Sequence, residues 1–370
     1  MNSQRRRHKL TRNTALTARK LTNRLGKGWR GLLLGLVLIL CFSLSWGAHV
    51  YFSVQGAVNK TYHATTGHPT AKVAQKKPIS VLILGVDQGI EGRHDRGNSD
   101  TMILATANPQ TKSATLTSLP RDLLVDVKGD KHDKYYMGRI NSAYEFGGSK
   151  GSILTTQALL NVPVHYYMEV NMKALSELVD AVGGVDVQVP FSFTYNTRFH
   201  KGKMHLNGKQ ALDYARMRKS DPKGDYGRQA RQRQIILAIV NEALSIKSLN
   251  NYRAILKAFS QNVKTNMSFD DMMGLATNYR SCASNISSDY IHGHDAWIGG
   301  AAMQVAQTKE LQRISDRVRA GLGLTKETLH NQETRQNRLN RKHHLKWSDP
   351  TAFENYVVYS RHSHRPWDGN

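Results

Sequence analysis

The stretch ISVLILGVD, residues 79–87, is an unbroken apolar run that ends in a carboxylate. A β-strand covered on both faces has this character, because neither of its faces meets water. Two further strands are predicted close behind it, at 101–107 and 114–119, separated by an Asn-Pro turn. Strands and helices then alternate along the chain, which predicts a mixed α/β fold with a central sheet flanked by helices.

The remaining elements are predicted from apolar periodicity and from the glycines and asparagines at their ends. A helix over 172–182 is ended by Gly183 and Gly184, and another helix, reaching about residue 217, opens at Asn207. The other predicted strands are 164–170 and 185–189, and the other predicted helices are 141–146, 153–160, 228–245, 250–260, 268–278 and 305–322.

Residues 31–54 are apolar on every side and contain no Asp, Glu, Lys or Arg. About 20 such residues span the hydrocarbon core of a bilayer. Ten Lys and Arg residues precede the run, and this excess indicates a cytoplasmic N-terminus. A cleaved signal peptide is the alternative, but the run is long for one and no clean cleavage site follows it. We therefore predict one transmembrane helix in the cell membrane, with the rest of the chain outside the cell.

Charge and composition divide the chain into segments. The net charge is +24, from 52 basic and 28 acidic residues, and no Asp or Glu occurs before Asp87. Blocks of one charge sign are usually solvated tails. We therefore predict a basic cytoplasmic tail, the transmembrane helix, a polar linker, one extracellular domain and a basic tail that is either disordered or loosely docked, at 1–30, 31–54, 55–78, 79–322 and 323–370. The two cysteines, Cys41 and Cys282, provide no disulfide framework and no cysteine-based metal site.

Two carboxylates lie at the ends of neighbouring predicted strands. Asp87 follows the first strand, and Asp100 opens the second. Ligands of open α/β sheets bind beyond the carboxyl ends of the strands, where two carboxylates can share a hard cation such as Mg²⁺. The alternative is a pair of turn or cap aspartates, which are common.

Five arginines within eighteen positions form the strongest chemical signal in the chain. They are Arg216, Arg218, Arg228, Arg231 and Arg233. The planar guanidinium matches phosphate oxygens bidentately, so this density indicates an anionic partner. On the predicted helix, Arg228 shares a face with Arg231 and Gln232, and Asp225 either caps the helix or holds an arginine in place. A solvated basic face is the alternative.

Two more arginines lie where predicted elements meet loops. Arg121 follows the third strand, where a phosphate clamp would be useful, and Arg139 precedes a short helix, whose N-terminus favours an anion. As alternatives, Arg121 forms only a weak surface pair with Asp122, and Arg139 is an ordinary residue near a helix start.

The order of these motifs resembles the LytR–CpsA–Psr (LCP) family of cell-envelope proteins. The resemblance covers roughly residues 79–245 and continues to about residue 320. It is carried by the segments ISVLILGVD (79–87), NSDTMILATANP (98–109), LTSLPRD (116–122), RINSAYEFGG (139–148), VPVHYYMEVN (162–171), LVDAVGGVDVQVP (178–190), LNGKQALDYARMR (206–218) and GDYGRQARQRQ (224–234).

The resemblance implies an LCP-type domain on a single-pass membrane protein. Such enzymes are phosphotransferases that move an anionic glycopolymer, a teichoic acid or a capsular polysaccharide, from a polyprenyl-pyrophosphate carrier onto peptidoglycan. It implies Mg²⁺ held by Asp87 and Asp100, catalytic roles for Asp87, Arg121 and Arg218, and a supporting role for Asp225. The implied pyrophosphate-binding residues are Arg121, Arg139, Arg216, Arg218, Arg228, Arg231 and Gln232.

This sequence departs from the family pattern at two of these positions. The family commonly has an arginine directly before Ser-Asp-Thr, where this chain has Asn98, with Arg96 two residues earlier. Arg139 stands where a lysine is frequent, and this exchange keeps the charge. A lipid carrier also requires apolar walls. Met172, Leu175, Leu178 and the helix face over 235–240 are candidate walls, with core packing as the alternative.

Three other functions use the same features. The first is a phosphatase that hydrolyses a lipid pyrophosphate with water as the acceptor. The second is a non-catalytic anchor that binds wall polymers through charge. The third is a membrane-bound transcriptional attenuator that contacts DNA, in line with older descriptions of the family. The predicted topology places the arginines outside the membrane, and no DNA-binding motif is evident, so no nucleic-acid partner is expected.

Overall fold

The computed structural model describes residues 61–63, 72–86, 97–129, 135–243, 252–343, 345–363 and 365–367, together with residues 48, 52, 53, 55 and 56. The chain forms two compact units, Met1–Gly56 and Ala57–Asn370, and every element below belongs to the second unit. Among the described residues, no helix is both long and apolar enough to cross a bilayer. Nearly all of the predicted span at 31–54 lies outside those residues.

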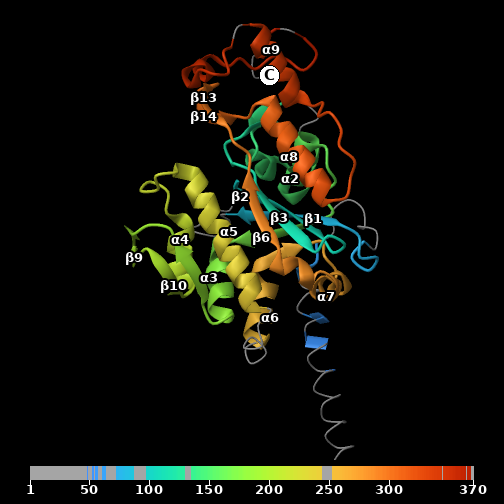
Figure 1. The fold of residues 1–370 in the computed structure, drawn as a ribbon, viewed down its shortest axis with the longest axis vertical. Helices are drawn as coiled ribbons and strands as arrows, with labels where there is room; N and C mark the ends of the chain where they lie inside the picture. The colour runs from blue at the N-terminus through green and yellow to red at the C-terminus, as the bar shows by residue number, and fades with distance from the viewer. Residues whose placement is uncertain are drawn as a thin grey trace, which may run out of the picture. The chain divides into compact units, whose positions relative to one another are not determined.

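A six-stranded sheet forms the centre of the second unit (Figure 1). In spatial order its strands are β11 (Val263–Thr265), β6 (Tyr166–Asn171), β1 (Ile79–Val86), β2 (Ser99–Asn108), β3 (Ser113–Ser118) and β12 (Ile286–Tyr290). Strand β1 pairs antiparallel with β2 and parallel with β6, and β3 pairs antiparallel with β2 and parallel with β12. The predicted mixed α/β sheet is therefore confirmed.

Helices cover the central sheet on both faces, and this explains why strand β1 is apolar throughout. On one side, Leu82 and Leu84 join the main hydrophobic core, which includes residues of α2 (Ser142–Leu160) and α8 (Thr308–Gly321). The alternate residues Ile83 and Gly85 line a cavity on the other side. The helices of that side are α3 (Met172–Ala181), α4 (Gly208–Arg216), α5 (Gly224–Ala243) and α6 (Tyr252–Asn262). Figure 1 shows α2 and α8 together on one side of the sheet, and α3, α5 and α6 on the other.

Small two-stranded sheets and short helices complete the unit. The strand pairs are β4 (Leu124–Asp126) with β5 (Met137–Arg139), β7 (Val185–Val189) with β10 (Gly202–Leu206), β8 (Phe193–Tyr195) with β9 (Thr197–Phe199), and β13 (His294–Ile298) with β14 (Ala301–Val305). The other helices among the described residues are α7 (Phe269–Asn278), α9 (Gln332–Lys342) and two 3₁₀ helices, Arg280–Ser284 and Pro350–Asn355.

Local sequence signals set several boundaries as predicted. Asn207 caps α4 with a full capping box, in which its side chain accepts from the backbone of Gln210 and Gln210 returns the bond. Gly183 and Gly184 both adopt positive φ, at 90° and 94°, which allows the sharp turn from α3 into β7. The two helices predicted at 141–146 and 153–160 are a single helix, α2, interrupted by the non-helical backbone of Gly148.

Of the two alternatives predicted for the segment after residue 322, disordered or loosely docked, its described residues show docking. Helix α9 packs against the domain through buried polar side chains. Asn337 Nδ2 donates to Ala306 O at 2.9 Å, and Gln336 Nε2 donates to Tyr359 O at 2.7 Å. Farther along, Phe353 is fully buried in a cluster with residues of β13 and β14. Sequence periodicity missed this helix because amide hydrogen bonds, rather than an apolar stripe, hold its inner face.

Candidate functional site

The start of β2 and the loop after β3 bring an arginine and a carboxylate together. Arg121 Nη1 donates to Asp100 Oδ1 at 2.7 Å, and both side chains are partly exposed. Arg121 Nε also lies 3.5 Å from Asp122 Oδ2 without making a hydrogen bond. Burial lowers the pKa of Arg121, but the hydrogen bond to Asp100 and the nearby carboxylates outweigh it and raise that pKa. Arg121 is therefore a fixed, permanently charged cation with an unused donor.

Arg228, on the first turns of α5, lies in the same charged pocket as Arg121 and Asp100. Its Nη2 is 2.6 Å from Asp225 Oδ1, yet the geometry is not that of a hydrogen bond, and neither Nε nor Nη2 has an acceptor in the described part of the chain. Arg228 is only 8% exposed, and this burial lowers its pKa even though Asp225 opposes the effect. Buried donors without acceptors are costly in a folded protein, so their presence here indicates an external anionic ligand.

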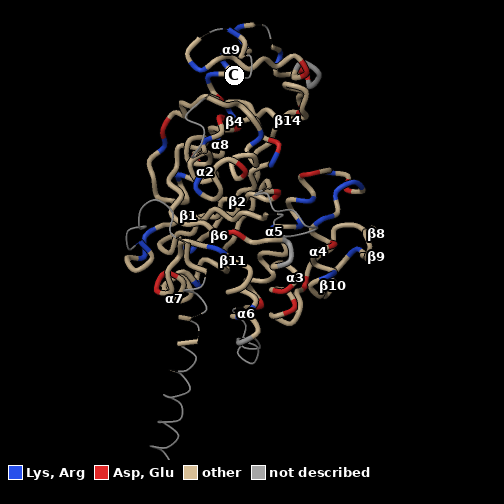
Figure 2. Tube along the Cα trace, turned by 180° about the vertical axis from the view of Figure 1, so that it is seen from behind, with Lys and Arg blue, Asp and Glu red and all other residues tan. Residues whose placement is uncertain are grey.

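Arg216 and Arg218 line a second, wider pocket of about 1060 Å³. Arg218 Nε is 3.6 Å from Asp225 Oδ1, and the Arg218 side chain is half exposed. Asp225 therefore stands between Arg218 and Arg228 and contributes to both pockets. This agrees with the prediction that Asp225 holds an arginine in place. Figure 2 shows Lys and Arg, together with Asp and Glu, along the segment where α4 leads into α5.

Arg231 shares the helix with Arg228 but has a different environment. Its side chain is 2% exposed and pairs with the equally buried Asp221. Arg231 Nε donates to Tyr214 O at 2.9 Å, and Nη2 donates to Met217 O. The guanidinium also lies 5.6 Å from the ring centroid of Phe193. All three guanidinium nitrogens are thus engaged by the protein, and this geometry favours a role in fixing the loop between α4 and α5 over the predicted contact with pyrophosphate.

The structure brings Arg139 near the charged pocket but not into it. Arg139 Nε donates to Ala302 O at 3.0 Å and lies 3.5 Å from Asp122 Oδ1. Because Asp122 also contacts Arg121, the two arginines lie on either side of one carboxylate. Arg139 is linked to the cluster through Asp122.

The Mg²⁺ site at Asp87 and Asp100 stays a prediction. Asp87 lies outside the described residues, and within the described ranges no group of three or more acidic, His or Cys side chains could hold a metal ion. Asp100 Oδ1 is occupied by Arg121, while Asp100 Oδ2 has no hydrogen bond to any described residue. A single free carboxylate oxygen fits a hard cation such as Mg²⁺, which binds proteins through one or two carboxylates and takes the rest of its ligands from phosphate and water.

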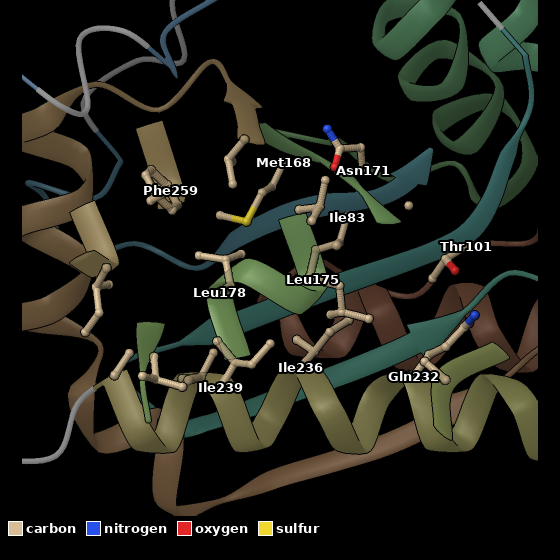
Figure 3. Close-up of a pocket in the computed structure, with 18 residues that line it drawn as sticks. Ile83, Thr101, Met168, Asn171, Leu175, Leu178, Gln232, Ile236, Ile239 and Phe259 are labelled. Carbon is tan, nitrogen blue, oxygen red and sulfur yellow. The ribbon is translucent and has the colours of Figure 1, made fainter. Parts of the chain in front are cut away.

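An apolar cavity of about 270 Å³ lies between the sheet and helices α3, α5 and α6 (Figure 3). Leu175, Leu178, Ile236 and Ile239 point into it from two of the helices. The sequence named these positions as candidate walls and left core packing open. The side chain of Met172, another candidate, is outside the described residues. Phe259, which sequence reasoning missed, closes the cavity from α6.

The apolar cavity meets the charged pocket at two shared residues. Thr101 and Gln232 line both, with Gln232 7% exposed on the face of α5 that also carries Arg228. An apolar chain in the cavity would therefore have its end beside Arg228 and Arg121. The predicted neighbours Arg228 and Gln232 are indeed together at this junction, as their spacing of one helical turn requires.

Comparisons with known proteins agree with this combination. The model of the LytR_cpsA_psr family matches residues 48–320. A polyisoprenyl-teichoic acid–peptidoglycan teichoic acid transferase TagU from Enterococcus faecalis is 41% identical over 299 residues, which cover 80% of this chain and 97% of that protein. Several other relatives, from Bacillus species, have the same transferase name.

Solved structures show the same fold. Protein gbs0355 from Streptococcus agalactiae is 34% identical with a TM-score of 0.68, and the match covers 76% of this chain and all of that chain. The structure of TagT bound to LIIa-WTA is 26% identical with a TM-score of 0.58, covering 71% of this chain and 95% of that chain. Together with the matched motifs and the family model, these similarities show that the chain belongs to the LytR–CpsA–Psr family.

Proposed function

We propose that this protein is a phosphotransferase that attaches an anionic cell-wall glycopolymer, of the teichoic acid or capsular type, to peptidoglycan. The observation that carries the proposal is the position of Thr101 and Gln232, where an apolar cavity adjoins a cluster that contains Arg121 and Arg228. A polyprenyl-pyrophosphate carrier has this composition, with a hydrocarbon chain on an anionic head. The relatives named above, whose names include a polyisoprenyl-linked teichoic acid and peptidoglycan, support the same substrates.

The arginines supply the charge that the reaction needs. Arg218 lines the wide pocket in which the pyrophosphate would lie, and Arg121 and Arg228 lie in the charged cluster that shares Asp225 with this pocket. A glycan hydroxyl, the 6-hydroxyl of an N-acetylmuramic acid residue, attacks the phosphorus that carries the polymer. A phosphodiester forms, the P–O bond to the bridging oxygen breaks, and polyprenyl phosphate leaves with that oxygen. Guanidinium groups fixed in advance stabilise the charge that develops on the phosphate oxygens, and this term dominates such reactions.

Asp100 and Asp87 are the residues that would hold Mg²⁺. Asp100 offers its free Oδ2, and Asp87 follows β1, the strand beside β2. When bound, Mg²⁺ would neutralise phosphate oxygens and orient the pyrophosphate. Asp100 also orients Arg121, so its carboxylate serves two positively charged groups. Asp87 is a candidate for the base that accepts the hydroxyl proton as well as for a metal ligand.

The location of the enzyme follows from its substrates. Polyprenyl carriers remain in the membrane, and peptidoglycan lies outside it. We therefore propose that residues 31–54 anchor the protein as a single-pass helix, with residues 1–30 in the cytoplasm and the catalytic domain facing the wall of a Gram-positive-type envelope.

A transfer assay tests the proposal against its alternatives. The purified protein is incubated with Mg²⁺, a labelled lipid-pyrophosphate-linked polymer and peptidoglycan oligosaccharides. Label that moves to the glycan supports a transferase. Release of polyprenyl phosphate with no glycan labelling identifies a lipid-pyrophosphate phosphatase. Polymer binding with no reaction identifies an anchor, and a membrane-bound transcriptional attenuator would show neither reaction nor polymer binding.

A further inference from the structure

The β13–β14 hairpin has one face buried and one face open. Its inner face, which includes Ala296 and Val305, packs against the C-terminal segment around Phe353. The ring of His294 stacks on Phe353, with centroids 4.2 Å apart and planes within 5°. The C-terminal segment thus supports the hairpin from behind, and the opposite face is free to meet a ligand.

The open face of the hairpin carries a tryptophan beside hydrogen-bonding groups. Asp295 and Trp297 are two residues apart on β13 and point to the same side, and Gln304 is the cross-strand partner of Asp295. Trp297 is 62% exposed. Gln304 Nε2 donates to Asp295 Oδ1 at 3.1 Å, so the two polar side chains hold each other in place.

This face forms one wall of the wide pocket that Arg216 and Arg218 line. Asp295 and Gln304 both line that pocket, and Trp297 lies one pleat beyond them along the strand. Figure 1 shows the hairpin next to the part of the molecule where α4 leads into α5. The pocket therefore extends from the proposed phosphate site towards an exposed aromatic ring.

Three backbone contacts fix the hairpin to the charged site. Gln304 N donates to the backbone oxygen of Asp122 at 2.8 Å, and Asp122 directly follows Arg121 in the sequence. Ala302 O accepts from Arg139 Nε at 3.0 Å. Gly293 N donates to the Tyr226 hydroxyl at 2.9 Å, from the helix that carries Arg228. The distance between the hairpin face and the arginines is thus set by direct bonds.

We propose that this face, made of Asp295, Trp297 and Gln304, binds the acceptor glycan next to the pyrophosphate, an inference that rests on the proposed function. A sugar ring of N-acetylated hexosamine type has an apolar C–H face, which stacks on the Trp297 ring, and hydroxyl and amide donors around its edge. A carboxylate such as that of Asp295 accepts hydrogen bonds and donates none, so it favours a ligand that has donors. The negative charge of Asp295 also repels the phosphates of the lipid-linked polymer, so this face disfavours that substrate and favours the acceptor glycan.

The first experiment measures steady-state transfer with varied acceptor oligosaccharide and, separately, with varied lipid-linked donor. Trp297→Ala and Asp295→Asn should each raise the acceptor KM about tenfold, the size expected for an aromatic contact or a charge-assisted hydrogen bond. The donor KM should not change. Trp297→Phe should restore most of the acceptor affinity. The matched control is Met273→Ala, which removes an exposed apolar side chain from α7.

A binding measurement separates this inference from the proposed function. Calorimetric titration of the protein with a soluble peptidoglycan oligosaccharide requires no transfer. Binding that Trp297→Ala weakens and Met273→Ala does not supports the glycan site, even if the wild-type protein proves to be a phosphatase. Transfer by the wild type with an unchanged acceptor KM in both hairpin variants overturns it. A rise in the donor KM instead would overturn it by assigning the hairpin to the polymer.

Discussion

Arg121 Nη1 and Asp100 Oδ1 are joined by a hydrogen bond of 2.7 Å, so one carboxylate orients a cation at the site proposed for pyrophosphate. Both side chains are partly open to solvent, whereas Arg121 Nε is buried and has no hydrogen-bond acceptor among the described residues. In the proposed mechanism, Asp100 would act through Arg121 as well as through its second carboxylate oxygen. Orientation before the substrate arrives lowers the reorganisation that the transition state would otherwise require.

Asp100→Asn should reduce kcat for transfer by roughly 10²-fold, since it removes the charge partner of Arg121 and a hard oxygen ligand. The donor KM should change much less. Transfer kinetics at several Mg²⁺ concentrations check this prediction. Unchanged kinetics at all concentrations would show that Asp100 serves neither Arg121 nor a metal.

Arg218→Ala should lower transfer by about 10²–10³-fold with the domain still folded, because a half-exposed side chain contributes little to stability but supplies transition-state charge. Single-turnover transfer and a thermal melt measure the two effects. Normal turnover by this variant contradicts the role given to the residue.

Arg231→Ala should behave differently from Arg218→Ala. It leaves the Asp221 carboxylate buried without its partner, at a cost of about 3–5 kcal/mol in the free energy of unfolding. Denaturant unfolding of the two variants side by side tests the distinction. A stable but inactive Arg231→Ala protein would contradict this structural role and support the predicted contact of Arg231 with pyrophosphate.

Ile239→Trp should narrow the apolar cavity and disfavour long polyprenyl chains. The donor KM should rise for long carriers and stay unchanged for short ones. Leu237→Trp is a matched control, because Leu237 is on the same helix but lines a different pocket. Equal effects of the two variants on long carriers would argue against lipid binding in this cavity.

The docking of α9 should make stability depend on pH. Burial raises the pKa of Glu333 from its ordinary value of 4.5 to about 7, although the bond from Asp126 N opposes this. The folded state then binds more protons than the unfolded state between these two values, so stability falls as the pH rises from about 4.5 to about 7.

Glu333→Gln keeps an acceptor for Asp126 N and removes the titration. The variant should lose the decline in stability, which is roughly 1–3 kcal/mol across this pH range. Chemical denaturation at a series of pH values measures it. Identical pH profiles for the wild type and the variant would contradict a protonated, buried Glu333.

The sequence predicted the central sheet because β1 must be apolar on both faces. Its dense arginines indicated an anionic partner, which stays a prediction. The sequence did not distinguish Arg228 from Arg231, because residues three positions apart on a helix lie on the same face. Arg231 is buried because it pairs with the buried Asp221, and this contact can be seen only in the tertiary structure.

The C-terminal segment and the hairpin were missed for a different reason. The buried amides of Gln336 and Asn337 look like surface residues in a sequence. The short strands around Trp297 were not predicted, and the helix expected from residue 305 onward overlapped the end of the second strand. The apolar cavity was foreseen only as a possibility, because Leu178 and Ile239 would have the same pattern in a packed core.

The most direct test of the proposed reaction is its stoichiometry. A donor labelled separately in the lipid and in the polymer is incubated with peptidoglycan oligosaccharides, and both products are counted in one reaction. A transferase yields one polyprenyl phosphate for each polymer joined to glycan through a phosphodiester. Polyprenyl phosphate in large excess over labelled glycan, with free polymer phosphate in solution, would contradict the transfer mechanism.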